Sequence, residues 1–100
     1  MILVKKHITN NRLMLALCDK DIFGKKYIEN SVVLDLNCDF YNGLVMPDDE
    51  IKELIKKSYI VNAAGIKSIN LIKELNLIDE KNILFIEKIP HAQILITINE

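Results

Sequence analysis

Arginine, cysteine and long apolar runs are scarce in this chain of 100 residues. Arg12 is the sole arginine, so lysine supplies the other basic side chains. Lysine is a point charge without the bidentate fork that favours recognition of phosphate and bases. The 13 basic and 14 acidic residues nearly cancel, and the sequence pI is about 6.1. A protein that grips nucleic acid with its whole surface has a pI of about 9 or above, so only a local basic patch stays open.

The two cysteines, Cys18 and Cys38, argue against a zinc site. Neither they nor His7 and His91 show the close paired spacing of zinc fingers and ribbons, so we expect no metal and no cofactor. Standard hydrolase motifs also fail, because no serine lies in a nucleophile elbow. No apolar run approaches the roughly 18 residues of a membrane span, and no signal peptide is recognisable. We therefore expect a cytoplasmic protein with reduced thiols and no membrane contact.

Half of the residues are hydrophobic, which is enough to build a core. Because no repeat, low-complexity tract or linker is present, residues 1–100 are predicted to form a single globular domain. Residues 2–7 and 12–18 predict two strands joined at Thr9-Asn10-Asn11, since asparagine tolerates the left-handed backbone of such a turn. The second of these strands is apolar on both faces, which indicates an interior strand. A further strand is expected at residues 31–35.

Two helices are predicted in the second half of the chain. Pro47 and the three acids after it suit the first turn of a helix, and Lys56-Lys57 suit its end. A short strand at residues 59–61 then leads through a small-residue turn into the second helix. Asn76 is expected to end that helix, and a strand at residues 83–86 follows it. The residues of the second helix that we expect to face the core are Ile66, Ile69, Ile72 and Leu75.

Strand, turn, helix and strand in this order form a βαβ unit, whose crossover is almost always right-handed. The last two strands are predicted to pair as an antiparallel hairpin around Pro90-His91-Ala92-Gln93. The predicted fold class is therefore α+β, a two-layer α/β arrangement with a mixed sheet. It has an N-terminal β-hairpin, one βαβ crossover, two helices packed on one face of the sheet, and a C-terminal β-hairpin.

The small-residue turn Asn62-Ala63-Ala64-Gly65 is the first candidate site. It lies between a strand and a helix, where small residues let backbone amides approach a ligand and the helix N-terminus favours an anion. Asn62, Ala63, Ala64 and Gly65 are therefore candidates for binding a carboxylate or phosphate. The alternative is a tight turn in which Asn62 caps the helix, because the full glycine-rich fingerprints are missing.

His91 and Gln93 form the second candidate site, on the predicted turn of the last hairpin. His91 is the candidate for acid or base catalysis near neutral pH, and Gln93 could orient a carbonyl of a substrate or partner. Pro90 is compatible with either peptide isomer. If the strands before the two motifs are parallel neighbours, both motifs lie at one end of the sheet and an anion on the turn lies within reach of His91. The alternative is a hairpin whose polar side chains satisfy the backbone.

Aromatic residues beside lysines form the third candidate, a surface for RNA or a partner. Lys25 and Lys26 stand next to Tyr27, so two cations and a ring could meet phosphate and a base. A second aromatic pair precedes the Asn-Gly turn, where Phe40 is expected in the core and Tyr41 at its rim. The RNA-contact candidates are therefore Lys25, Lys26, Tyr27 and Tyr41. The alternative is a solvated turn beside aromatic residues that serve packing.

Four motifs occur along the chain in this order: Gly24-Lys25, Phe40-Tyr41-Asn42-Gly43, Val61-Asn62-Ala63-Ala64-Gly65 and Pro90-His91-Ala92-Gln93. Together they resemble the small archaeal family catalogued as domain of unknown function 424, over essentially the whole chain. The last motif is the most specific. The resemblance implies an archaeal, cytosolic, single-domain housekeeping protein linked with the translation apparatus. It implies no catalytic residue, because the family has no established activity.

Three functions follow from these candidates. We rank first a non-enzymatic module that binds RNA or a ribonucleoprotein, through the two lysines and a sheet edge expected near His91. The second is a small-molecule or anion site, enzymatic or sensory, between the turn at residues 62–65 and His91 with Gln93. The third is a protein-interaction adaptor or homodimer that covers an exposed sheet edge.

Overall fold

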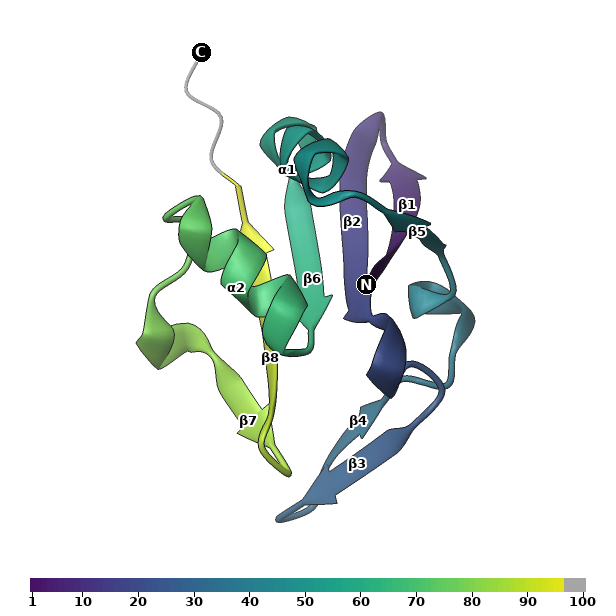
Figure 1. Ribbon diagram of the computed structural model, residues 1–100, viewed down its shortest axis with the longest axis vertical. Helices are drawn as coiled ribbons and strands as arrows, with labels where there is room; N and C mark the ends of the chain where they lie inside the picture. The colour runs from purple at the N-terminus through teal and green to yellow at the C-terminus, as the bar shows by residue number, and fades with distance from the viewer. Residues whose placement is uncertain (97–100) are drawn as a thin grey trace.

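The computed structural model describes residues 1–96 and contains a six-stranded mixed sheet and a separate two-stranded sheet (Figure 1). The strands are β1 (Ile2–Thr9), β2 (Arg12–Asp19), β3 (Lys26–Glu29), β4 (Val32–Asp35), β5 (Leu44–Met46), β6 (Ile60–Ala64), β7 (Leu84–Ile86) and β8 (Ile89–Leu95). The large sheet has the order β5-β1-β2-β6-β8-β7, and β3 pairs with β4. Only the β2–β6 pair of the described strands is parallel. The predicted α+β class with a mixed sheet is confirmed.

A tight turn with left-handed backbone connects the two strands in each of the first two hairpins. Asn10 and Asn11 (φ 52° and 61°) connect β1 with β2, and Asn30 and Ser31 (φ 49° and 71°) connect β3 with β4. Two successive residues with positive φ give a turn whose twist matches that of the strands. The N-terminal hairpin is confirmed, as is the interior position of β2 between β1 and β6. The strand expected near residues 31–35 is β4.

The C-terminal hairpin turns earlier in the chain than predicted. Glu87 and Lys88 have the left-handed backbone of the turn (φ 50° and 69°), and β8 begins directly afterwards. The motif Pro90-His91-Ala92-Gln93 therefore lies inside β8, and its prediction as a turn was wrong. The peptide bonds of the described residues, that before Pro90 included, are trans.

The second predicted turn is also mostly strand. Because β6 extends to Ala64, the residues Asn62, Ala63 and Ala64 belong to the sheet, and only Gly65 forms the junction with the second helix. The strands β6 and β7 run in the same direction, but β8 pairs with both of them and lies between them. The predicted crossover from β6 through α2 to β7 is thus present. However, β6 and β7 are not neighbours in the sheet, although the sequence had suggested this.

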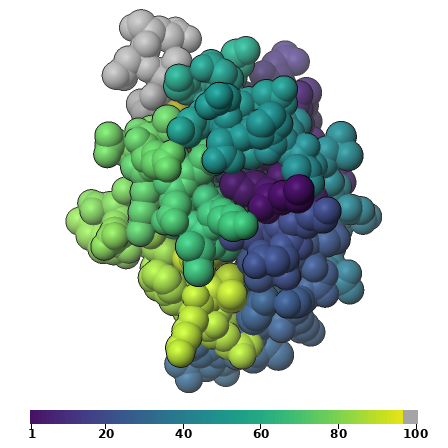
Figure 2. Space-filling model, viewed as in Figure 1, coloured from purple at the N-terminus to yellow at the C-terminus, as the bar shows by residue number. Residues whose placement is uncertain are grey.

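The helices α1 (Asp48–Lys57) and α2 (Ile66–Glu74) cover one face of the large sheet, as predicted. In Figure 2 they lie over the sheet, with the N-terminal end of the chain (purple) visible between them. Ile69 and Ile72 are buried and Leu75 is half-buried, but Ile66 is 61% exposed, so its prediction as a core residue was wrong. Ile66 is the first residue of α2, and the buried side of this helix begins only at Ser68. Asn76 ends the helix with φ 56°, as predicted.

Two hydrophobic cores lie on the two faces of the large sheet. The main core, between the helices and the sheet, includes Leu15, Leu17, Ile51, Ile55, Val61, Ile69 and Ile72. The second core forms where the β3–β4 hairpin and the turn η2 (Asp39–Tyr41) pack on small residues of β2 and β6. We call this second face of β1, β2, β6 and β8 the helix-free face. Within residues 1–96, neither helix has the length and apolar character needed to cross a membrane.

Candidate functional site

The N-terminus of α2 is already occupied by a carboxylate of the protein itself. Asp19, at the end of β2, is 4% exposed. Its side chain accepts hydrogen bonds from the amides of Lys67 (2.9 Å) and Ser68 (2.8 Å), and from the Ser68 hydroxyl (2.7 Å). These amides are the donors that would have held an external anion, which contradicts the predicted amide cradle. Asn62 does not cap the helix either, since Asp19 satisfies its first amides.

Gly65 makes this arrangement possible. Its φ is 109°, a backbone conformation that side chains other than glycine rarely adopt, and a Cβ there would lie 2.3 Å from Cγ of Asp19. The glycine therefore serves the approach of the Asp19 carboxylate to the helix. The sequence offered no direct signal for this contact, because Asp19 and Ser68 lie 49 residues apart and meet only through the parallel pairing of β2 with β6.

The two C-terminal motifs are brought together by the sheet register. Ala64 is opposite His91, and Asn62 is opposite Gln93, on the antiparallel strands β6 and β8. Side chains of directly opposed residues lie on the same face, here the helix-free face. Ala63 points the other way and belongs to the main core. Asn62, Ala64, His91 and Gln93 are therefore neighbours, but they meet across the antiparallel strands β6 and β8 and not at the ends of two parallel neighbours, the arrangement on which their predicted proximity depended.

The half-buried His91 and the buried Tyr41 form a polar pair at one end of this face. The Tyr41 hydroxyl lies 3.4 Å from Nε2 of His91. Burial lowers the pKa of His91 and raises the pKa of Tyr41 to about 12, so both groups are uncharged at neutral pH. Tyr41 is 6% exposed while Phe40 is only half-buried, which reverses the predicted core and rim positions. Tyr41 is thus a packing partner of His91.

The lysines and tyrosines proposed as an RNA surface are not assembled into one. Lys25 and Lys26 are exposed near the start of β3. Tyr27 is half-buried and packs against the second core, in which Tyr41 is a buried member. Tyr41 is buried and Tyr27 is half-buried, so the exposed members of the predicted contact surface are its two lysines.

A different part of the helix-free face carries features that sequence reasoning missed. The register aligns Lys5, Ala16, Asn62 and Gln93 in one row across the sheet, and His7, Met14, Ile60 and Leu95 in the next. Met14, Ile60 and Leu95 belong to neither hydrophobic core, and Leu95 is 59% exposed. This region, which we call the polar platform, consists of these two rows together with Arg12 at the start of β2. Among its apolar side chains Leu95 is exposed, Met14 and Ile60 are half-buried, and Ala16 is buried in the second core.

Basic and ring-bearing side chains stand at the β1 side of the polar platform. His7 stacks on Phe40, with ring centroids 4.6 Å apart and planes 12° from parallel, and its Nε2 lies 3.0 Å from the Phe40 carbonyl oxygen. Lys5 donates from Nζ to the carbonyl oxygen of Asp39 (2.7 Å), a neutral acceptor. Arg12 places its guanidinium 4.3 Å from the ring centroid of Tyr59.

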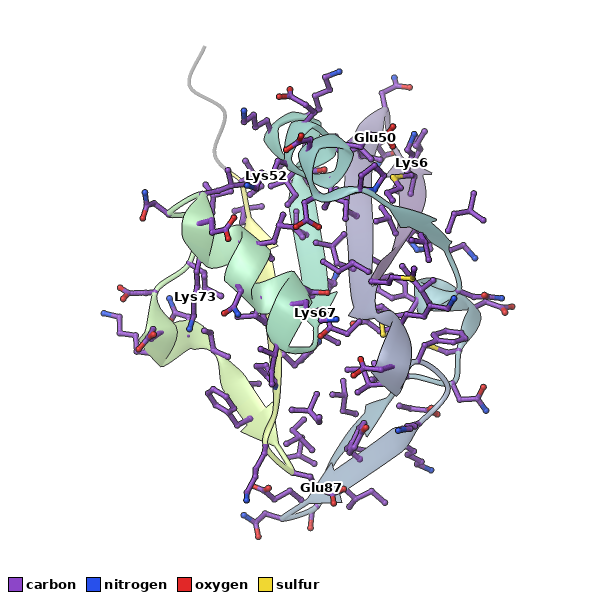
Figure 3. The ribbon with its side chains drawn as sticks, viewed as in Figure 1. Lys6, Glu50, Lys52, Lys67, Lys73 and Glu87 are labelled. Atoms are coloured by element: carbon purple, nitrogen blue, oxygen red, sulfur yellow. The ribbon has the colours of Figure 1, made fainter. Side chains whose placement is uncertain are left out.

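The polar platform contains no acidic residue, although the protein has more acids than bases. The four ion pairs formed within residues 1–96 lie elsewhere and involve Lys52–Glu74, Lys56–Glu53, Lys73–Glu80 and Lys81–Asp79. On the helix side, acidic and basic side chains are mixed (Figure 3). Lys5 and Arg12 therefore have no carboxylate partner among the described residues. No group of three or more His, Cys, Asp or Glu side chains in that part of the chain could hold a metal ion.

Comparison with known proteins places the chain in a family. No curated protein matches the sequence. One solved structure, described as an uncharacterized conserved protein from Methanopyrus kandleri, is similar with a TM-score of 0.80 and 27% identity, over 99% of this chain and 94% of that one. The family model described as "Protein of unknown function (DUF424)" matches residues 7–96. The chain thus belongs to the DUF424 family of proteins of unknown function.

Proposed function

We propose that the protein is a non-enzymatic module that binds RNA through the polar platform. The observation that carries the proposal is the separation of charge on the molecule. A chain with a formal net charge of −1 has no acidic residue in the two rows of the polar platform and leaves Lys5 and Arg12 without carboxylate partners within residues 1–96. Unneutralised cations are what a phosphate backbone needs, because binding is driven by release of its counterions.

The composition of the polar platform supports RNA over a purely electrostatic partner. Open sheet faces bind RNA by stacking unpaired bases on rings and apolar side chains, while cations at the border contact phosphates. Here the stacked pair of His7 and Phe40 borders a stripe of Met14, Ile60 and Leu95. Binding of RNA would also remove this apolar stripe of the polar platform from water, which favours the complex.

The surroundings of His91, the candidate for catalysis, support an enzymatic function less well than RNA binding. His91 is neutral, half-buried and paired with Tyr41, and the nearest helix N-terminus is filled by Asp19. Archaeal origin, a cytoplasmic location and a link with translation belong to the proposal as well. The archaeal source is supported by the similarity to the protein from Methanopyrus kandleri, whereas the link with translation is part of the proposal alone.

The affinity of two charge-matched double variants for single-stranded RNA tests the proposal. Lys5→Gln with Arg12→Gln removes two charges from the polar platform, and Lys25→Gln with Lys26→Gln removes two from the start of β3. We expect the first variant to weaken binding about tenfold at low salt, and to reduce the slope of log K against log salt by about 1.4. The second variant should bind like the unmodified protein.

Fluorescence anisotropy with a labelled RNA pool measures both quantities, and thermal unfolding verifies that each variant is folded. Weakening confined to the Lys25 and Lys26 variant would move the site to β3 and contradict the proposal. Absence of any salt-dependent RNA binding by the unmodified protein would reject it altogether.

A second candidate function, a protein adaptor or homodimer, is favoured by one edge of the sheet. β7 pairs with β8 only as far as His91, whereas β6 pairs with β8 as far as Leu95. The bonds from the Gly65 amide to the Pro90 carbonyl and from the Ile96 amide to the Tyr59 carbonyl fix which residues of β8 bond to β6. The backbone groups of Gln93 and Leu95 therefore point outward, where an added strand could pair with them. Light scattering after size exclusion tests this candidate, and a strictly monomeric protein would count against the homodimer.

A further inference from the structure

Asn62 is a nearly buried amide with almost no hydrogen bonding of its own. Its side chain lies in the middle of the polar platform and is 8% exposed. Its one side-chain hydrogen bond within residues 1–96 runs from Nδ2 to the sulfur of Met14, at 3.8 Å. A thioether is a weak acceptor, whereas buried amides in proteins normally have strong partners. Asn62 thus occupies a position where a polar side chain costs stability without a compensating bond inside the protein.

The unused groups of Asn62 are directed to the surface. No fully buried side-chain nitrogen or oxygen of the described residues lacks a partner, so the Asn62 oxygen, which has none, must be reachable by solvent. Ala16 stands opposite Asn62 on β2 and is buried in the second core, so the open neighbour of Asn62 is the exposed Gln93 on β8. The amide can therefore offer both a donor and an acceptor to a ligand that lies on the platform.

A second amide stands directly beside the first. Gln93 is exposed and is the cross-strand partner of Asn62, so their Cβ atoms are expected about 4.5–5.5 Å apart. No side-chain hydrogen bond of Gln93 is formed within residues 1–96, which leaves its donor and acceptor available too. Two adjacent amides with unused groups form a surface that matches a planar group with alternating donors and acceptors.

We propose that Asn62 and Gln93 together recognise the hydrogen-bonding edge of one unpaired nucleobase. The inference rests on the proposed RNA binding and specifies the ligand of the same platform as single-stranded RNA. In an A-form duplex the Watson–Crick edges are engaged in pairing and the major groove is too narrow for side chains, so an unpaired base is the form that presents its pairing edge to a flat sheet. Lys5 and Arg12 hold the phosphates, and the amide pair distinguishes the bases.

The test compares base preference in amide variants with a matched control. Gln93→Ala and Asn62→Ala each remove one of the two amides, and Asn70→Ala removes an exposed amide from α2 on the other side of the molecule. Labelled homopolymers of adenylate, cytidylate and uridylate, each about 12 nucleotides long, serve as probes, together with a duplex of equal length. Anisotropy titrations give the affinity for each probe at two salt concentrations.

We expect the unmodified protein to bind one homopolymer at least about fivefold more tightly than another, and the duplex more weakly than either. Gln93→Ala and Asn62→Ala should reduce the preference below about twofold without changing the salt dependence, because phosphate contacts are separate from base contacts. Asn70→Ala should keep the preference. Because Gln93 is exposed, Gln93→Ala should fold, and it tests the inference even if Asn62→Ala does not fold.

Four results would overturn this inference. Salt-dependent RNA binding without base preference, or with a preference that survives Gln93→Ala, would reject base recognition by the amide pair and leave the proposed function intact. Equal affinity for duplex and single strands would do the same. Failure to bind any of these probes at either salt concentration would reject both the proposed function and the inference.

Discussion

At the scale of single residues, one contact decides how the second helix begins. The carboxylate of Asp19 replaces the external anion that a small-residue turn suggests, and Gly65 is the residue that lets it approach. A capping carboxylate that comes from a neighbouring strand joins β2 to α2, in addition to satisfying orphan amides. The positions of β6 and of the polar platform on it therefore depend on this buried network.

Gly65→Ala tests that dependence. The new Cβ would meet Asp19 within 2.3 Å and would also be strained at φ 109°, so we expect a loss of about 4 kcal/mol in the free energy of unfolding. Gly24→Ala is the matched control, because Gly24 has φ 90° but no atom within 4 Å of an added Cβ. It should cost about 1–2 kcal/mol, the strain alone. Urea unfolding measures both, and equal losses would contradict a special role of the Asp19 contact.

The pair of His91 and Tyr41 predicts how stability varies with pH. Burial lowers the pKa of His91 in the folded protein below its ordinary value of 6.5, so the unfolded chain takes up the proton first as the pH falls. Stability from this residue is therefore complete above pH 6.5 and decreases as the pH falls from there through the folded pKa. NMR titration of the His91 ring should give a pKa below 6.5.

His91→Gln is the control for this prediction. In the variant, the loss of unfolding free energy between about pH 7.5 and about pH 5.5 should be smaller than in the unmodified protein. A ring that titrates above 6.5, or an unchanged loss of stability in the variant, would contradict the burial of a neutral imidazole beside Tyr41.

At the scale of elements, two hairpins close over the second core through their turns. Oε2 of Glu87 accepts a hydrogen bond from the amide of Ile28 (2.7 Å), and Oε1 of Glu29 accepts one from the amide of Glu87 (2.8 Å). Figure 3 shows Glu87 between the tips of the β7–β8 and β3–β4 hairpins. Because β3 and β4 form a sheet of their own, these two bonds are the polar link between the hairpin and the rest of the molecule at this end.

Glu87→Ala should loosen the β3–β4 hairpin without unfolding the protein. The Ile28 amide loses its acceptor at the exposed edge of β3, so we expect its hydrogen exchange to accelerate about tenfold or more. Glu80→Ala, which breaks the exposed pair with Lys73, is the control and should leave the hairpin protected. Exchange at Ile28 that is equal in the two variants would show that packing alone holds the hairpin.

Local signals predicted most of these elements, and the failures have a common physical cause. Asn10-Asn11 was recognisable as a turn because asparagine tolerates positive φ, whereas Glu87 and Lys88 adopt the same conformation without that preference. Pro90 suggested a turn because proline rarely lies inside a sheet. Pro90 is tolerated because β6 has already ended opposite it. The Gly65 carbonyl accepts a hydrogen bond from the Ile69 amide, so it needs no donor from residue 90.

The candidate site was predicted only in part, because it depends on register. Asn62 was singled out in a small-residue turn and Gln93 on the predicted turn of the last hairpin, and the structure places them side by side. Lys5 and His7 were overlooked, since nothing local connects β1 with residues more than 50 positions later. Their place on the platform follows from the pairing of β1 with β2 and of β2 with β6.

At the scale of the whole molecule, charge is arranged by side. The helices carry mixed acids and bases, several of them joined in ion pairs such as Lys52–Glu74. The polar platform on the opposite side carries no acid, and its cations have only neutral partners. Net charge near zero thus conceals a local surface suited to an anionic polymer. The proposed RNA binding depends on this uneven distribution of charge.

Titration of the isotopically labelled protein with single-stranded RNA tests the claim most directly. The side-chain amide signals of Asn62 and Gln93 report on the polar platform, and that of Asn70 reports on the helix side. We predict that the first two shift in a saturable way while Asn70 stays unchanged, with shifts that fade as salt is raised. Shifts confined to Asn70 and the helices, or no shift at any signal, would contradict an RNA-binding platform.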